Sequence, residues 1–162
     1  MSITLRPAGD HDENFLRDLY ATTRQEEIAY LPWTPEAKLD FVRMQFDAQR
    51  RHYNATYPNA DQSIVLVAGA PAGRFYVDRQ DTQVLIVDLT LLPEFHRRGI
   101  GSALVSTLQR EAGSSGKSIT GHVERRNPAQ IFWRQLGFEV TPADDMYFRI
   151  LWVSSSISRA TT

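Results

Sequence analysis

The sequence predicts an α/β or α+β fold, in which helices cover a central sheet of mixed strand direction. Residues 3–7 alternate and end at a proline, which is typical of a short strand. Two segments with helical spacing of apolar residues follow, at 11–27 and 34–53. From residue 63 on, the pattern changes to period two and predicts three strands, then helix, strand, helix and two strands.

Both predicted helices near the N-terminus have apolar positions. In the first, one face carries Phe15, Leu16, Leu19 and Tyr20. The second has Thr34 as its expected N-cap and Pro35 in its first turn. Its apolar positions are less regular and are Leu39, Val42, Met44 and Phe46.

The remaining elements are bounded by turn residues. The segment from Tyr53 to Asp61 is predicted to be a loop, and "GAPAG" (69–73) is predicted to turn between two strands. The strand over 84–92 is expected near the middle of the sheet. The later elements are a helix at 101–112, a strand at 117–124, a helix at 128–136 and strands around 138–140 and 146–153.

Composition limits the classes of function. The 162 residues, 42% of them apolar, suit one domain, expected at 1–153 and followed by a flexible polar tail at 154–162. Eighteen basic and nineteen acidic residues give a net charge of −1, so nucleic acid and membrane partners are not expected. Cysteine is absent, no apolar stretch approaches about 20 residues, and a cytoplasmic location is expected. The four histidines (His11, His52, His96 and His122) lack ligand spacing, so no metal is expected.

The segment "RRGIGSAL" (97–104) places two glycines between a strand and a helix. A dinucleotide fingerprint would need glycine at Leu104, and a Walker loop ending in "GKS" (116–118) would need glycine at Glu111. A third interpretation fits: main-chain N–H groups at a helix N-terminus bind an anion such as a pyrophosphate. Arg97 and Arg98 either add positive charge there or are ordinary surface arginines.

Two motifs resemble the GNAT acetyltransferase superfamily. "VDLTLLPEFHRRGIGSAL" (87–104) resembles its acyl-coenzyme A motif, (Gln/Arg)-x-x-Gly-x-(Gly/Ala), with His96 in place of Gln or Arg. "NPAQIFWRQLGF" (127–138) resembles its second signature, and the element order agrees along essentially the whole chain.

The resemblance implies a GNAT fold, with a mostly antiparallel sheet of about seven strands and about four helices. It implies acetyl-coenzyme A as co-substrate, held chiefly by main-chain N–H groups, and an oxyanion contact where the central strand splays from its neighbour. Asn127 would cap a helix, contact the pantetheine arm, or do both. The cofactor-binding residues implied are Leu89, Thr90, Leu91, Arg97, Arg98, Gly99, Ile100, Gly101, Ser102, Asn127 and Trp133.

Acetyl transfer to an amine needs a base, because a primary amine is protonated at neutral pH. Asp88, on one face of its strand with Thr90, is the first candidate, followed by His122 and by Glu26 in the loop expected between the first two helices. Asp88 could instead form a salt bridge with an arginine, and His122 could instead be a structural histidine. The family's usual acid is a tyrosine at the position of Trp133, so either Tyr147, Tyr76 or water replaces it, or no acid is needed.

The expected activity is direct transfer of the acetyl group from acetyl-coenzyme A to a primary amine of a small molecule or protein. The alternative is an acyl-coenzyme A sensor without turnover. Acceptor selection is expected from the first two helices and their connection, with Arg24, Glu26, Tyr30 and Trp33 as candidate residues. Exposed strand edges near the C-terminus leave a homodimer open.

Overall fold

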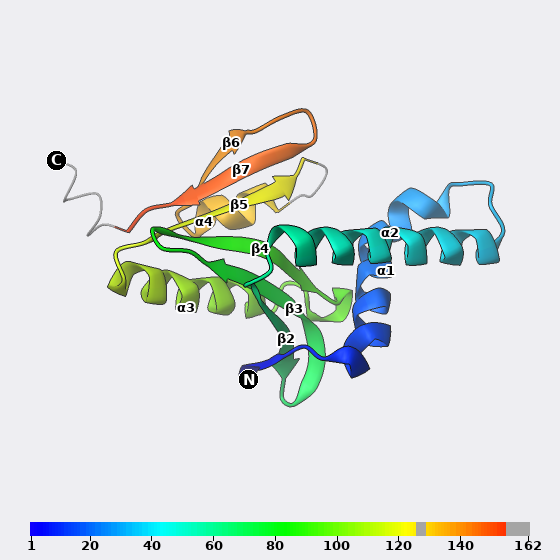
Figure 1. Ribbon diagram of the computed structural model, residues 1–162, viewed down its shortest axis with the longest axis horizontal. Coiled ribbons are helices and arrows are strands. Elements are labelled where there is room, and N and C mark those ends of the chain that lie inside the picture. Colours follow the sequence, from blue (N-terminus) through cyan, green and yellow to red (C-terminus); the bar gives the residue numbers. More distant parts are fainter. Residues whose placement is uncertain (126–128, 155–162) are drawn as a thin grey trace. The chain divides into compact units, whose positions relative to one another are not determined.

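The computed structural model describes residues 1–125 and 129–154. It contains a seven-stranded sheet in the order β1-β2-β3-β4-β5-β7-β6, together with four α-helices (Figure 1). The pairs β1–β2, β5–β7 and β6–β7 are antiparallel, and β4–β5 is parallel. This confirms the predicted fold class. The elements are β1 (Ile3–Pro7), η1 (Asp10–Asp12), α1 (Glu13–Ala29), α2 (Pro35–Thr56), β2 (Asp61–Val67), β3 (Ala70–Arg79), β4 (Gln83–Leu91), η2 (Pro93–Phe95), α3 (Ile100–Ser114), β5 (Ser118–Glu124), α4 (Gln130–Gln135), β6 (Glu139–Pro142) and β7 (Tyr147–Trp152).

The chain divides into two compact units. The first consists of residues 1–75 and 89–96, and the second of residues 76–88 and the chain from Arg97 on. Strands β3 and β4 therefore contribute residues to both units. The functional grouping of residues 1–153 as a single domain stays a prediction, and residues 155–162 of the expected tail lie outside the described part.

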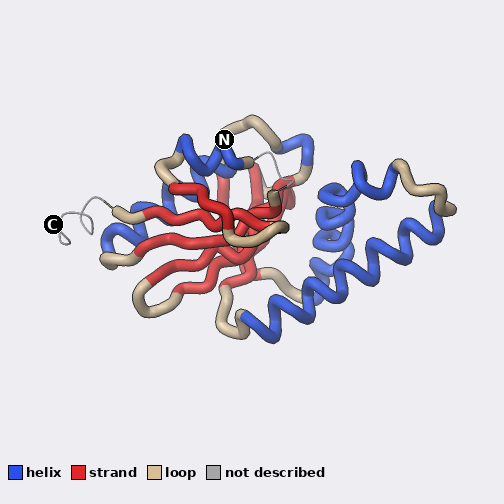
Figure 2. Tube along the Cα trace, turned by 90° about the horizontal axis from the view of Figure 1, so that it is seen from above, coloured by secondary structure: helices blue, strands red, loops and turns tan. Residues whose placement is uncertain are grey.

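An apolar cluster holds the first unit together. Figure 2 shows α1 and α2 side by side. The ring of Tyr20 in α1 packs against the ring of Phe46 in α2, with 6.0 Å between the ring centroids. The predicted apolar face of α1 is confirmed, because Leu16, Leu19 and Tyr20 are buried and Phe15 packs against the cluster. The core cluster consists of Leu16, Tyr20, Ile28, Val42, Phe46 and Ile64.

Helix α2 begins as predicted and ends later. The Thr34 side chain accepts the N–H of Ala37 at 3.1 Å, and Pro35 is the first helical residue. The helix continues to Thr56, so the expected loop at Tyr53–Asp61 is wrong at both ends: residues 53–56 are helical and Asp61 opens β2. The ring contacts between His52, Tyr53 and Tyr57 accompany this last turn.

Two predicted apolar positions of α2 face outward. Met44 is 57% exposed because it is two residues from both Val42 and Phe46 and therefore points away from their face. Leu39 is 48% exposed and lines, with Val42, a groove between α1 and α2 of about 360 Å³.

The turn between β2 and β3 is tighter than the sequence suggests. It consists of Ala68 and Gly69, both with positive φ (50° and 82°), and residues 70–73 already belong to β3. A two-residue turn with two left-handed residues matches the twist of a hairpin, which is why the strand can begin so early.

The second unit has its own apolar interior. Helix α3 contributes Ile100, Val105 and Leu108, and the strands contribute residues that include Ile119 and Ile150. The predicted bounds of the later elements agree with the structure to within about two residues, and Pro128, the expected start of α4, lies outside the described residues. Among the described helices, none combines the length and the apolar character that a membrane span requires.

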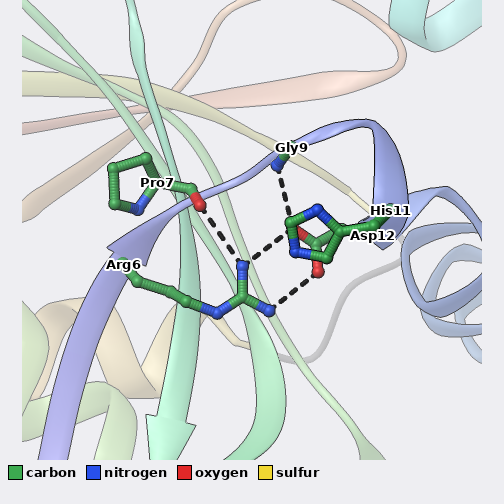
Figure 3. Close-up of polar contacts among 5 residues, drawn as sticks. All are labelled: Arg6, Pro7, Gly9, His11 and Asp12. Carbon is green, nitrogen blue, oxygen red and sulfur yellow. Dashed lines mark hydrogen bonds and ion pairs between the residues drawn. The ribbon is translucent and has the colours of Figure 1, made fainter.

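A buried carboxylate fixes the connection from β1 to α1 (Figure 3). Asp12 accepts two hydrogen bonds from the Arg6 guanidinium, both at 2.8 Å, and a third from the Gly9 N–H at 2.8 Å. The Asp12 side chain is only 6% exposed. The hydrogen bonds from Arg6 hold the pKa of Asp12 well below its usual range. Folding therefore favours the ionised carboxylate.

We expect Asp12→Asn to lower the melting temperature at pH 7 by several degrees, because a buried charged pair loses one partner. The Asp12 pKa is lower in the folded than in the unfolded chain, so its contribution is complete above the ordinary carboxyl pKa of about 4 and declines as the pH falls below it. The difference in stability between wild type and variant should therefore shrink in acid. Asp10→Asn is the matched control, since Asp10 is exposed in the same turn. A difference that stays constant from pH 7 to pH 3 would contradict the assignment.

Candidate active site

The end of β4 lies against the backbone of β3. A Cβ atom on Gly73 would overlap the carbonyl oxygen of Thr90 and would lie 2.9 Å from the Cα of Leu91. No side chain larger than hydrogen fits there without moving a backbone. Gly73 therefore permits a close approach of β3 to the segment Leu89–Leu91, for which the oxyanion contact is predicted.

The spacing of two backbone hydrogen bonds indicates an extra residue in β4. Gln80 N–H donates to the Gln83 carbonyl at 2.9 Å, and Leu92 N–H donates to the Ala72 carbonyl at 2.8 Å. Between these bonds the chain of β4 advances nine residues, from 83 to 92, and that of β3 eight, from 80 to 72. One residue in excess on one strand is the signature of a β-bulge. A bulge interrupts the regular ladder locally and bends the strand that carries it.

The pairing of β4 with β5 covers only part of either strand. It joins Gln83–Ile86 to Ser118–Gly121, whereas β4 runs on to Leu91 and β5 to Glu124. Asp88 and His122 both follow this paired segment. Alternation puts Asp88 on the face of Ile86 and Gly121, and His122 on the other face. The structure therefore does not bring these two base candidates together.

His122 instead has polar neighbours on the antiparallel side. It lies opposite Arg149 of β7, and Glu124 lies opposite Tyr147, so these four side chains share one face of β5 and β7. His122 and Arg149 are exposed, while Glu124 and Tyr147 are half-buried. The predicted acid Tyr147 is thus placed near His122 rather than near Asp88.

The loop into α3 presents main-chain donors. Gly99 is the N-cap of α3 with φ 77°, and the first intrahelical bond runs from Ala103 N–H to the Gly99 carbonyl at 3.0 Å. Glycine offers no side chain to cap the helix, which leaves the N–H groups of Ile100, Gly101 and Ser102 available to a ligand. Arg97, itself at φ 59°, and Arg98 are exposed beside them. Such a helix start attracts anions.

The two glycines of this loop serve different purposes. Gly99 adopts a left-handed conformation with open space around it. Gly101 faces α4, where an added Cβ would lie 3.3 Å from the ring of Phe132. The second glycine therefore has a packing role between α3 and α4, which the motif by itself does not reveal.

Of the two predicted pantetheine contacts, only Trp133 lies in the described part of the chain. The Trp133 side chain lies in α4, is 6% exposed, and packs edge-on against Phe132 and Phe138 at 4.9 and 5.1 Å. It has the environment of a core residue. Asn127 lies outside the described residues.

The predicted acceptor residues lie on α1 and on the chain that follows it. Glu26 is exposed near the C-terminal end of α1, which continues to Ala29. The prediction that Glu26 lies in a loop is therefore wrong. Arg24 bonds Tyr20 Oη at 3.1 Å and Glu27 at 3.2 Å. Tyr30 is 90% exposed and Trp33 41% exposed. Tyr76, the other acid candidate, is buried in β3.

Gly73 and His96 were not predicted as site residues. Gly73 is the last residue of the turn sequence "GAPAG" and looks like part of a turn, and only the pairing of β3 with β4 reveals its role. His96 occupies a motif position, and its departure from Gln or Arg is a signal that could have drawn attention to it. In the structure its Nε2 lies 2.8 Å from the Leu91 carbonyl oxygen.

Comparisons with known proteins give the family and the fold. Residues 61–140 match the acetyltransferase (GNAT) domain family. No curated protein matches the sequence. The prediction that the chain belongs to the GNAT superfamily, and is an acyltransferase, is confirmed.

Solved structures share the fold at low sequence identity. The PaiA N-acetyltransferase of Thermoplasma acidophilum, in complex with coenzyme A, has a TM-score of 0.70 at 17% identity, over 95% of this chain and 100% of that one. An acetyltransferase of Thermus thermophilus has a TM-score of 0.66 at 15% identity, over 95% of this chain and 98% of that one. Arabidopsis thaliana Naa50, in complex with a bisubstrate analogue, has a TM-score of 0.61 at 16% identity, over 95% of this chain and 100% of that one.

We expect Gly73→Ala to destabilise the protein by about 1–3 kcal/mol, because the added methyl group overpacks two adjoining backbones. Gly113→Ala is the matched control: its Cβ would meet only Ser154 and Trp152, at 3.6 and 3.8 Å, in a helix where alanine is favoured. Thermal unfolding of both variants measures the difference. Equal melting temperatures would show that β3 and β4 do not require the close approach.

Proposed function

We propose that this chain is an N-acetyltransferase that passes the acetyl group of acetyl-coenzyme A directly to a primary amine in a ternary complex. The observation that carries the proposal is the N-terminus of α3, which has no side-chain cap and begins behind the left-handed Gly99. Main-chain N–H groups at 97–102 would bind the diphosphate, with Arg97 and Arg98 adding positive charge.

The main chain of Leu89–Leu91 would stabilise the thioester oxygen as it gains charge. Removing one such donor from an enzyme typically costs about 10²–10³ in rate, so the position of this segment has a large effect on catalysis. The Gly73 contact supports the proposal, because it allows the β4 backbone to depart from a regular ladder at these residues. Trp133 and Asn127 remain proposed contacts of the pantetheine arm.

The amine must lose a proton before or during attack, and the candidate bases are Asp88, His122 and Glu26. Asp88 and His122 both follow the paired segment of β4 and β5, on opposite faces. The attacking nitrogen forms a bond to the thioester carbon, its proton passes to the base or to water, and the carbon–sulfur bond breaks. Tyr147 is the hydroxyl on the His122 face.

The departing sulfur needs no dedicated acid in this proposal. A thiol has an ordinary pKa near 8.5, so the thiolate is a fair leaving group near neutral pH. The buried Trp133 indole stands where the family has its tyrosine, and an indole N–H donates a hydrogen bond but does not give up its proton at ordinary pH. The acceptor is proposed to be a small-molecule or peptide amine selected by the exposed Tyr30, Trp33 and Glu26 and by Arg24.

We expect Gly99→Ala to weaken coenzyme A binding about tenfold, because the strained N-cap shifts the N–H groups that face the diphosphate. Gly116→Ala is the matched control. Gly116 follows the other end of α3, has φ 68° and is also surrounded by open space. Both variants should lose a similar ~1–2 kcal/mol of stability from the left-handed conformation. Calorimetric titration with coenzyme A should separate them; equal affinities would refute the proposed diphosphate site.

Turnover distinguishes the enzyme from the sensor. With acetyl-coenzyme A and a panel of polyamines, amino acids, aminoglycosides and N-terminal peptides, we expect thiol release that depends on one class of amine. A protein that binds the coenzyme and releases no thiol with any of them would be the sensor.

In the same assay, the variant that lacks the true base, Asp88→Asn or His122→Gln, should have a turnover rate about 10²-fold lower at pH 7. The rate should recover toward pH 10, where the amine deprotonates by itself.

A further inference from the structure

The connection from β4 to α3 contains a histidine whose side chain forms a hydrogen bond with the main chain at the end of β4. His96 follows the short turn η2, and its Nε2 lies 2.8 Å from the carbonyl oxygen of Leu91. A carbonyl oxygen only accepts hydrogen bonds, so Nε2 carries the proton and donates it. The bond spans five residues and closes the loop at the exit of β4.

The peptide group between Leu91 and Leu92 is therefore held at both of its polar atoms. Its carbonyl accepts from His96, and its N–H donates to the Ala72 carbonyl at 2.8 Å. Because a peptide group is planar, two such bonds fix the orientation of the whole plane. The next peptide group back along the chain carries the Thr90 carbonyl, which lies against Gly73.

We propose that His96 is a positioning residue for acyl transfer. It fixes the Leu91–Leu92 peptide plane and thereby holds the preceding main-chain N–H groups of Leu89–Leu91 where the thioester oxygen is to bind. This role rests on the proposed acetyltransferase function. It requires a hydrogen-bond donor at the position of Nε2 and involves no proton transfer.

The two effects of this bond differ in size. His96 is exposed, and a hydrogen bond open to water adds little to the stability of the fold. Misplacing catalytic groups by about 1 Å, in contrast, can cost on the order of a hundredfold in rate. Loss of the bond should therefore lower kcat while leaving the melting temperature nearly unchanged.

Three substitutions at one position test the proposal. The glutamine amide nitrogen reaches about as far as Nε2, whereas the asparagine amide reaches only as far as Nδ1. We expect His96→Gln to keep kcat within about threefold of wild type, and both His96→Asn and His96→Ala to lower it about ten- to hundredfold. The dissociation constant for coenzyme A should change less than about threefold in all three. A His96→Gln variant as slow as His96→Ala would overturn the proposal.

The pH–rate profile separates positioning from proton transfer. Glutamine cannot take up or release a proton in this range, so a positioning role predicts that wild type and His96→Gln share the same profile. A profile that loses one limb in His96→Gln would assign proton transfer to His96 and overturn the proposal.

Hydrogen exchange at the Leu92 amide tests the geometry without turnover. That N–H donates to Ala72, and its protection should fall about tenfold in His96→Ala and His96→Asn and stay at the wild-type level in His96→Gln. Unchanged exchange in His96→Ala would overturn the positioning role even in an active enzyme. If the variants change the exchange rate as expected but the wild-type protein transfers no acetyl group, only the proposed function is contradicted.

Discussion

The contact between the backbones of β3 and β4 at Gly73 is the constraint on which the candidate site depends. It brings the Thr90 carbonyl and the Leu91 Cα so near to β3 that no Cβ fits between them. The ladder resumes with the bond from Leu92 to Ala72. The irregular stretch is thus short and bounded, which lets main-chain groups leave the ladder without loss of the strand.

A site built from main-chain groups tolerates change in its side chains. The N–H groups at the start of α3 are present whatever residues carry them, provided that the N-cap can adopt a left-handed conformation, as Gly99 does. His96 and Trp133 differ from the motifs that the sequence resembles, yet neither change removes a main-chain N–H group. Such a site also fits a chain with almost no net charge, because the positive potential for an anion is local.

The elements around these segments have separate supports. In the first unit, an apolar cluster joins α1 and α2, and the buried carboxylate of Asp12 ties β1 to the start of α1. In the second, α3 packs on α4 through Gly101 and Phe132, and Gln109 of α3 donates to the Leu136 carbonyl at 2.8 Å. The exposed groups Tyr30, Trp33 and Leu39 lie on the helical part of the first unit, where substitutions leave the strand backbones untouched.

The sequence by itself determined the order of elements, the N-cap at Thr34, the apolar face of α1 and the glycine loop before α3. These features depend on local propensity and on periodicity, both of which are written into consecutive residues. It did not reveal that Leu39 and Met44 face outward, that α1 carries Glu26, or that Asp88 and His122 fall on opposite faces. Only the tertiary structure decided these, and with them the roles of Gly73, His96 and Gly101, because each depends on residues that are distant in the sequence or on a strand register that no short segment encodes.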